Sequence, residues 1–283
     1  MSKSKKSFLL VHGGPGMNSF AEERMLGAAF QKRGAQIEFW NEPSRLRPNG
    51  CPFTAENAFQ NAFESLERQF LKLAHSNGPV DLIALSFGSH YAVLLARKYP
   101  TLLSSISMIC PGLSLHTSCK NVLRVALKDF QKSDVQKAKE LEECIEMIRQ
   151  LGDESFLNGF TLALQDPALM THYWHNQNSM MEWVGILTSI GAEAGFDFES
   201  FISVLKSVPS PMAYLDGKVA DAPPVFVYFG EHDPIVSRDE EVQLVEQLFD
   251  HAKIMDLGQC SHFAHLEYSD HFAETVLSLL SDT

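Results

Sequence analysis

A serine, an aspartate and two histidines follow apolar runs in the chain order that acyl transfer could use. Ser86 ends one apolar run, Asp233 comes just after another, and His262 and His265 follow the last such run near the C-terminus. A serine hydroxyl is a weak nucleophile until a neighbouring base removes its proton, and an acid residue orients that base. The sequence therefore predicts Ser86 as nucleophile, Asp233 as the orienting acid in preference to Glu231, and one of the two histidines as base.

The segment around Ser86 and a glycine-rich loop near the N-terminus predict an oxyanion hole. Ser86 stands in Ala84-Leu-Ser-Phe-Gly88, one residue away from the G-x-S-x-G pattern of a sharp strand-to-helix turn. An earlier apolar run breaks into His-Gly-Gly-Pro-Gly, whose backbone N–H groups can bind an anion. The predicted donors to the oxyanion are the N–H groups of Gly14 and Phe87. A phosphate-binding loop is not predicted, because neither a Gly-Lys-Ser/Thr nor a G-x-G-x-x-G pattern is present.

Short β-rich runs that alternate with helical patterns must position these residues. The runs span residues 8–11, 36–40, 80–85, 105–109, 225–229 and 254–257. Their alternation predicts an α/β fold with a doubly wound, mostly parallel sheet of about six strands.

Helical periodicity replaces the β-rich runs between the fourth and fifth of them. The sequence predicts a core in two parts, residues 1–112 and 223–283, with an inserted helical cap at residues 113–222. Within the cap, one helix is expected over residues 133–151, with Ser133 and Gln136 as a capping box and Gly152 as its end. Asp166-Pro167 predicts the start of another helix.

These segments together resemble the α/β-hydrolase superfamily, and the His-Gly-Gly-Pro-Gly loop resembles that of its proline-iminopeptidase-like branch. Gly258, His262 and Glu267 match the late segment of the superfamily, Gly-x-x-x-His followed by an apolar stretch and Glu. The resemblance implies that His262 is the base, that His265 packs behind it, and that an acyl-enzyme forms without cofactor or metal. Serine at the strand-to-helix turn argues against dehalogenase and epoxide-hydrolase chemistry, because the related families use aspartate at that position.

The resemblance to the aminopeptidases of that branch is incomplete in the cap. Those enzymes bind the free α-amine of the substrate with cap glutamates, one of them in a Trp-x-x-Trp-Glu-like stretch, where this chain has Asn178. An uncharged ester or thioester is therefore the first substrate class, and a proline-iminopeptidase-like peptide or amide is the alternative. A non-catalytic ligand-binding homologue is a further alternative. Trp174, Met181 and Trp183 of the aromatic-rich and methionine-rich cap are predicted to contact the substrate.

Composition narrows the classes of partner. The 283 residues include 23 basic and 35 acidic residues, for a net charge of −12, so a nucleic acid partner is not expected. The expected partner is a small-molecule substrate, as the resemblance to the hydrolases implies. No apolar stretch approaches the roughly 18 residues that span a bilayer. The five cysteines are scattered and odd in number, which favours reduced thiols in a cytoplasmic protein over disulfides or a metal site. The sequence does not specify an oligomeric state.

Overall fold

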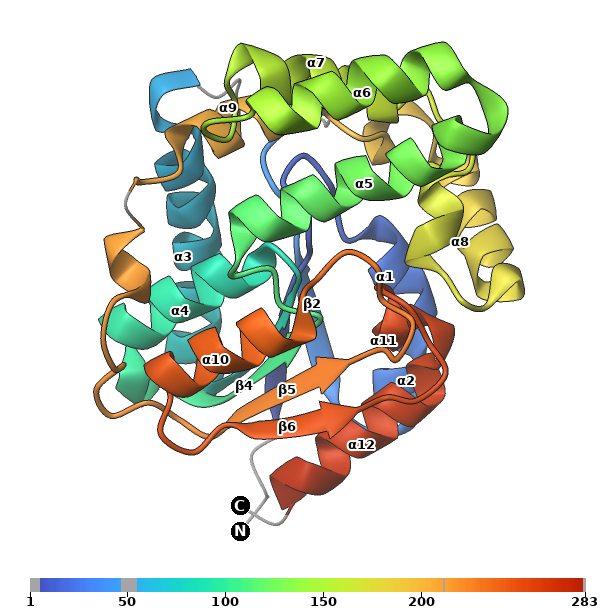
Figure 1. Ribbon diagram of the computed structural model, residues 1–283. Coiled ribbons are helices and arrows are strands. Elements are labelled where there is room, and N and C mark those ends of the chain that lie inside the picture. Colours follow the sequence, from blue (N-terminus) through green and yellow to red (C-terminus); the bar gives the residue numbers. More distant parts are fainter. Residues whose placement is uncertain (1–5, 47–54, 211, 282–283) are drawn as a thin grey trace, which may run out of the picture.

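The sheet at the centre of the molecule is parallel and has six strands, in the order β2-β1-β3-β4-β5-β6 (Figure 1). The computed structural model describes residues 6–46, 55–210 and 212–281. The strands are β1 Ser7–Val11, β2 Gln36–Trp40, β3 Val80–Leu85, β4 Leu103–Ile109, β5 Val225–Phe229 and β6 Lys253–Asp256. The predicted α/β fold with a doubly wound sheet of about six strands is confirmed.

Helices flank the sheet, as expected for parallel strands that need cover on both faces. They are α1 Phe20–Met25, α2 Gly27–Lys32, α3 Ala58–Asn77, α4 Gly88–Lys98, α5 Leu115–Ser133, α6 Val135–Met147, α7 Glu154–Ala163, α8 Gln177–Ile190, α9 Phe198–Ser207, α10 Arg238–Leu248, α11 Ala264–Glu267 and α12 Ser269–Ser281. Short 3-10 helices are η1 Ala55–Asn57, η2 Pro100–Leu102, η3 Leu169–Tyr173, η4 Ala192–Ala194 and η5 Ala213–Leu215. No helix of the described residues is both long and apolar enough to cross a membrane.

The strand order places two loops beside each other at the carboxyl edge of the sheet. β1 pairs with β2 on one side and with β3 on the other. Successive strands are therefore added first on one side of β1 and then on its other side, and the switch point lies between β1 and β3. Ligands of open α/β sheets bind at such a switch point, outside the carboxyl ends of the strands. Val11 is paired with Ala84, which brings the glycine-rich loop after β1 next to the turn that carries Ser86.

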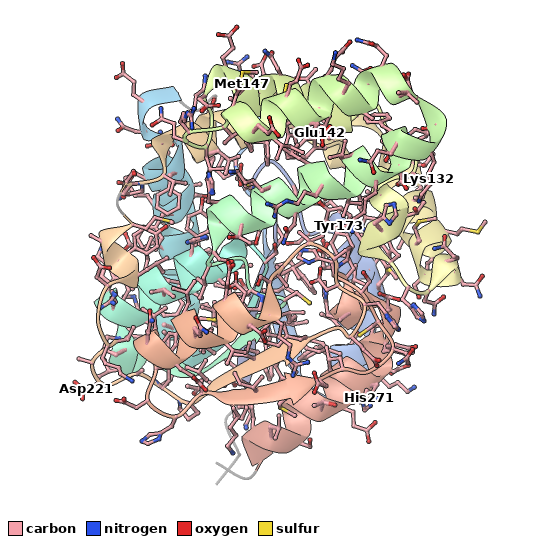
Figure 2. All side chains as sticks on the ribbon, viewed as in Figure 1. Lys132, Glu142, Met147, Tyr173, Asp221 and His271 are labelled. Atoms are coloured by element: carbon pink, nitrogen blue, oxygen red, sulfur yellow. The ribbon has the colours of Figure 1, made fainter. Side chains whose placement is uncertain are left out.

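Helices α5 to α9, here called the helical insert, lie between β4 and β5, and the described residues among them include no strand. α5 packs against α6, and α6 packs against α7. These helices lie above the carboxyl edge of the sheet (Figure 1). Figure 2 shows Glu142 and Met147 on the outer helix α6, whereas Tyr173 lies beneath α5. The insert agrees with the expected helical segment, and the boundaries of a cap at residues 113 and 222 stay a prediction.

The connection from the insert back to the sheet is held by one arginine of α4. The Arg97 guanidinium donates hydrogen bonds to the backbone carbonyls of Tyr214, Asp216 and Gly217, each at 2.7 Å, and to that of Lys218 at 3.2 Å. A guanidinium has five N–H donors in a fixed planar arrangement, which suits several carbonyls at once. The return connection is therefore fastened to a helix of the core.

Two of the expected helix boundaries in the insert are wrong. Ser133 is the last residue of α5, and α6 is capped instead by Asp134, whose carboxylate accepts the N–H of Lys137 at 3.1 Å. The helix also ends at Met147, before the predicted end, because the next N–H groups donate to Asp153, the N-cap of α7. Both differences arise because an aspartate side chain accepts the N–H groups that a continuous helix would have used.

The helix expected after Asp166-Pro167 is also different in the structure. The Asp166 carboxylate accepts the N–H of Ala168 at 3.0 Å, and only the short 3-10 helix η3 follows. The α-helix α8 begins later, after Asn176, whose side chain caps it. The Asp-Pro pair marks a turn here because the side-chain bond closes after two residues, rather than at the third residue of a helix.

Candidate active site

Ser86 lies at a sharp turn between β3 and α4. Its φ of 48° is in the left-handed region, which a residue with a Cβ adopts rarely and which is frequent at functional sites. A Cβ at Gly88 would lie 2.7 Å from the carbonyl oxygen of His12 and 2.8 Å from that of Val11. The backbones are therefore crowded at this turn, which explains the glycine two residues after Ser86.

The glycine-rich loop after β1 lies against this turn. A Cβ at Gly13 would be only 3.2 Å from that of Ser86. Gly16 fixes the far end of the loop: its N–H donates to the Glu42 carboxylate at 3.2 Å, and its carbonyl accepts the N–H of Asp197 at 2.8 Å. The loop is thus tied on one side to the segment after β2 and on the other to the helical insert.

The predicted oxyanion donors belong to this loop and to the serine turn. Gly14 has a φ of 122°, which favours glycine, and Phe87 directly follows Ser86. Within the part of the chain that the structure describes, neither N–H group donates a hydrogen bond to another protein group. Two unused donors beside a serine are the arrangement that a developing oxyanion requires.

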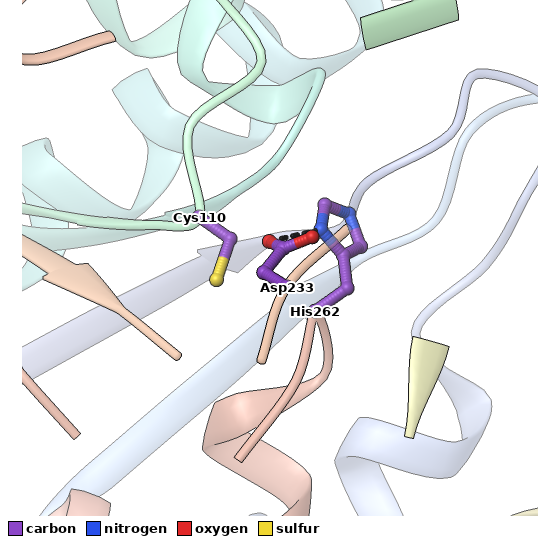
Figure 3. A group of neighbouring side chains, drawn as sticks. All are labelled: Cys110, Asp233 and His262. Carbon is purple, nitrogen blue, oxygen red and sulfur yellow. Dashed lines mark hydrogen bonds and ion pairs between the residues drawn. The ribbon is translucent and has the colours of Figure 1, made fainter. Parts of the chain in front are cut away.

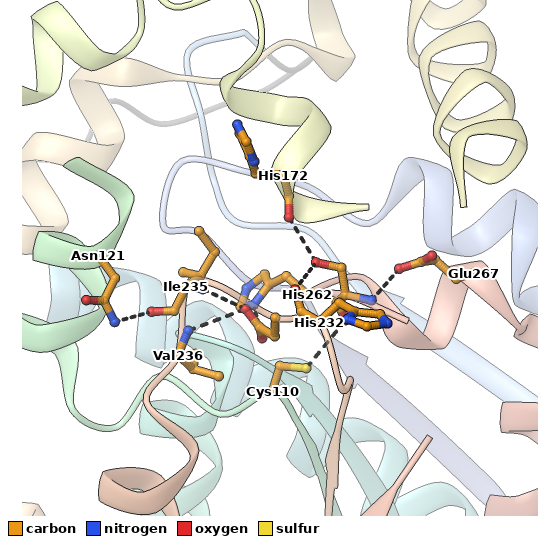
Figure 4. A network of polar contacts seen from close by, with 10 residues as sticks. Cys110, Asn121, His172, His232, Ile235, Val236, His262 and Glu267 are labelled. Carbon is orange, nitrogen blue, oxygen red and sulfur yellow. Dashed lines mark hydrogen bonds and ion pairs between the residues drawn. The ribbon is translucent and has the colours of Figure 1, made fainter. Parts of the chain in front are cut away.

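Asp233 and His262 form a buried hydrogen-bonded pair. His262 Nδ1 and Asp233 Oδ2 are 2.8 Å apart, and the two side chains are 4% and 3% exposed (Figure 3). Asp233 Oδ1 accepts the N–H groups of Ile235 and Val236 at 2.8 and 3.4 Å (Figure 4). Burial alone would raise the pKa of Asp233, but the neighbouring imidazole and these hydrogen bonds outweigh burial and hold the pKa below its ordinary value. An ionised Asp233 therefore accepts Nδ1–H and leaves Nε2 as the acceptor nitrogen.

Cys110, at the end of β4, adds a thiol to this pair (Figure 3). Ligand atoms of Cys110, Asp233 and His262 lie within 4.8 Å of one another, the only such cluster of possible metal ligands in the described ranges. Burial raises the pKa of the Cys110 thiol well above its ordinary value, so the thiol stays protonated. It lies beside the Asp233 carboxylate and donates to the backbone carbonyl of Ser261 at 3.9 Å. An ion would have to displace both this proton and the one shared by the pair, so the cluster fits a hydrogen-bonded dyad better than a metal centre.

A cavity of about 310 Å³ brings the predicted nucleophile, base and oxyanion donors together. Ser86, His262, Gly14 and Phe87 all line it. Among the described residues that line it there is no aspartate, glutamate, lysine or arginine, and most of these residues are apolar. A more open depression of about 510 Å³ lies between α6 and α7, away from all of these residues. The smaller cavity, which is within the size range of small-molecule sites, is therefore the candidate active site.

Of the three predicted substrate contacts, the structure brings one to this cavity. Trp183 lines it. Trp174 is buried behind the wall, with its ring 4.9 Å from that of Phe263, and Met181 points to solvent with 68% of its surface exposed. Met181 and Trp183 are two residues apart on α8 and so project from nearly opposite sides of the helix, whereas Trp174 precedes it.

His265 occupies a different environment from His262. It is fully buried and absent from the cavity, with its Nε2 3.9 Å from a carboxylate oxygen of Glu22. In contrast, Tyr173, which the sequence did not single out, lines the cavity and packs its ring edge-on against His262, 5.3 Å between centroids. A single aromatic residue in an aromatic-rich segment carries no signal that would have distinguished it.

Two buried carboxylates near the site were not foreseen as contacts of its loops. Glu241 of α10 accepts the N–H groups of Leu113 and Ser114, each at 2.9 Å, and the Ser114 hydroxyl. Burial raises the pKa of Glu241 to about 7. Glu267 accepts N–H groups from the His262 loop and from the insert. In the sequence, Glu241 is one of three acidic residues in the first turn of α10, and such residues are usually exposed, so nothing marks it as a contact of the site.

Comparison with known proteins agrees with this architecture. The model of the alpha/beta hydrolase fold family matches residues 44–268. No match is found among curated proteins. Similar solved structures include 2-hydroxy-6-oxo-6-phenylhexa-2,4-dienoate hydrolase from Rhodococcus sp. strain RHA1, with 17% identity, 97% of this chain and 90% of that chain covered, and a TM-score of 0.62.

Two further solved structures are similar over nearly the whole chain. A proline iminopeptidase-related protein from Thermus thermophilus has 17% identity over 99% of this chain and 91% of that chain, with a TM-score of 0.62. A thermophilic esterase from Thermogutta terrifontis has 16% identity over 99% and 90%, with a TM-score of 0.59. At these identities the likeness concerns the fold.

Proposed function

Because the chain belongs to the α/β-hydrolase fold family, we propose that it is a serine hydrolase for small apolar carboxylic esters or thioesters. Ser86 is the nucleophile, His262 the base and Asp233 the acid that orients it. The observation that carries this proposal is the shared cavity. The serine, the histidine and both oxyanion donors line one space, and its described lining includes no aspartate, glutamate, lysine or arginine.

The reaction runs in two halves through an acyl-enzyme. His262 Nε2 takes the proton of Ser86 as Oγ attacks the substrate carbonyl, and Asp233 stabilises the imidazolium through Nδ1–H. The N–H groups of Gly14 and Phe87 bind the oxyanion. His262 then gives the proton to the leaving oxygen or sulfur. Water, activated by the same histidine, attacks the acyl-enzyme and releases the carboxylic acid.

The apolar lining favours an uncharged acyl group over the α-amine of a peptide. An ammonium group inside this cavity would find no carboxylate partner among the lining residues that the structure describes, and a lost charge-assisted hydrogen bond costs about 1.5 to 3 kcal/mol. An alkyl or aryl acyl group instead gains about 25 cal/mol for each Å² of apolar surface buried. The aminopeptidase alternative keeps the glycine-rich loop and the Thermus neighbour in its favour, but it lacks the acid it needs.

Residues 113–222 act in this proposal as a cap that supplies the acyl-binding wall. Trp183, Phe160 and Phe201 come from the helical insert and line the same cavity as Ser86. A cytoplasmic location also belongs to the proposal. The four described cysteines are all free, which suits a reducing compartment, and Cys51 lies outside the described residues.

Covalent labelling tests the nucleophile first. A fluorophosphonate probe should label the wild-type protein, and Ser86→Ala should lose the label and at least about 10³-fold in kcat. Ser89→Ala is the matched control, because this neighbouring hydroxyl is buried and has no hydrogen-bond partner. A folded Ser86→Ala protein that still takes the label would contradict the assignment.

A substrate pair then tests the specificity. The protein should hydrolyse p-nitrophenyl butyrate with a higher kcat/KM than Pro-β-naphthylamide, by at least about tenfold, for the loss of a charge-assisted bond given above. Faster cleavage of the prolyl amide would favour the aminopeptidase. A protein that binds the butyrate ester but neither reacts with the probe nor turns over would be a non-catalytic ligand-binding homologue.

A further inference from the structure

The loop that carries His262 is joined to the start of α8 by a single carboxylate. Glu267 is buried at the end of α11. Its Oε1 accepts the N–H of Ser261 at 2.7 Å (Figure 4). Its Oε2 accepts the N–H groups of His175, at 3.0 Å, and Asn176. One side chain thus satisfies backbone donors from two segments that are far apart in the sequence.

Other contacts join the same two segments, residues 172–176 of the insert and 261–263 of the histidine loop. The Ser261 hydroxyl donates to the carbonyl of His172 at 2.9 Å (Figure 4). The N–H of Phe263 donates to the carbonyl of Tyr173 at 3.2 Å, and the Tyr173 ring lies against His262. The backbone on both sides of His262 is therefore held by the insert as well as by the core.

The Glu267 charge is compensated by these N–H groups rather than by a cation. No ion pair to Glu267 occurs in the described part of the chain. A buried carboxylate without such donors would be strongly unfavourable, so separation of the two segments leaves it partly unsatisfied. The carboxylate therefore favours the state in which both segments are docked on it.

Helix α8 depends on this attachment more than a typical helix does. None of its described residues is fully buried. Its N-cap is Asn176, whose side chain accepts the N–H groups of Asn178 and Ser179 while its own backbone N–H donates to Glu267. The weakly packed helix is thus fastened at its first turn to the loop of the base.

We propose that Glu267 is a positioning residue that couples docking of the insert to the placement of His262. When residues 172–176 leave Glu267, the 261–263 segment loses contacts on both sides of His262, and the base is no longer held in line with Ser86. The protein therefore hydrolyses its substrate only while the start of α8 is docked on Glu267. This inference rests on the proposed function, because it assigns the consequence of docking to the base of that mechanism.

The variant Glu267→Gln tests the coupling, since an amide keeps the size of the side chain but removes the charge and one acceptor. We expect kcat for p-nitrophenyl butyrate to fall about 10- to 100-fold, as for loss of a group that orients a reactive side chain, with KM changed less than about threefold. Hydrogen exchange should accelerate in peptides covering both 172–180 and 258–263. Glu274→Gln, an exposed carboxylate on α12, is the matched control.

The exchange measurement separates this inference from the proposed function, because it needs no substrate. Wild-type protein that fails to react with fluorophosphonate contradicts the proposed function. An unchanged kcat in a folded Glu267→Gln protein, or faster exchange in only one of the two segments, overturns the coupling. If Glu267→Gln does not fold, Ser261→Ala is the second variant. It removes the side-chain bonds to the carbonyls of His172 and His232 and leaves the Glu267 carboxylate in place. It should shift kcat and both peptides in the same direction, and no shift overturns the inference.

Discussion

Glu241 should make the stability of the protein depend on pH around neutrality. This carboxylate holds the segment after β4, which borders the serine turn, through Leu113 and Ser114. Burial is the largest influence on it and raises its pKa from an ordinary 4.5 to about 7, despite the hydrogen bonds it accepts. The folded protein therefore binds this proton more tightly than the unfolded chain does. The resulting stabilisation is complete below about pH 4.5 and is lost as the pH rises through 7.

The size of the effect follows from the two pKa values. The difference between about 7 and 4.5, at about 1.36 kcal/mol per pKa unit, corresponds to about 3 kcal/mol in the free energy of unfolding. Most of this loss falls between pH 5 and pH 8. Glu241→Gln has no proton to lose, so its free energy of unfolding should fall by about 2 to 3 kcal/mol less than that of the wild type over this interval.

Urea unfolding at pH 5 and pH 8 measures the effect. The readout is the change in the free energy of unfolding between the two pH values, compared between wild type and Glu241→Gln, because other groups titrate in both proteins. Glu246→Gln, an exposed carboxylate on the same helix, is the control and should keep the wild-type dependence. Equal pH dependence in wild type and Glu241→Gln would refute the reasoning. That outcome would mean that water reaches the carboxylate and that it titrates as an exposed glutamate does.

Three further outcomes test the site. His262→Ala should abolish fluorophosphonate labelling, whereas a folded His265→Ala protein should keep its labelling rate within about tenfold, and the reverse result would show that the bases were misassigned. Gly88→Ala should lower the free energy of unfolding, measured with urea, by about 1 to 3 kcal/mol, because a Cβ would lie 2.7 Å from a backbone oxygen. An unchanged free energy of unfolding would contradict the crowding. Trp183→Ala should raise KM for p-nitrophenyl hexanoate more than Met181→Ala does, since only Trp183 lines the cavity, and equal effects would count against that wall.

The sheet and its serine turn could be predicted because local sequence determines them. Strands that are buried on both faces need largely apolar runs, and β3 is apolar from Leu82 to Leu85. A sharp turn into a helix needs small residues at fixed offsets, and Gly88 supplies one. Local sequence also places Asp233 and the two late histidines at one edge of the sheet, since each follows an apolar run whose carboxyl end meets that edge. It does not choose between His262 and His265, and that choice rests on the resemblance to the superfamily.

Contacts that join distant segments could not be predicted in this way. Glu241 and Glu267 bind backbone N–H groups, and every residue except proline has one, so no residue type marks the partner. The same limit applies to Trp174 and Trp183 in the insert. Both belong to one aromatic-rich segment, yet only the packing of α8 against its neighbours decides which ring reaches the cavity.

The attachment of Arg97 to the return connection has a consequence for how this protein can vary. Four carbonyls between Tyr214 and Lys218 are held by a side chain of α4, so the path of the chain into β5 does not depend on the sequence of the insert. Backbone carbonyls are present whatever residues evolve there. We therefore expect changes of length or sequence within the helical insert to leave the path into β5 in place, and this junction is a natural point at which to graft a different insert.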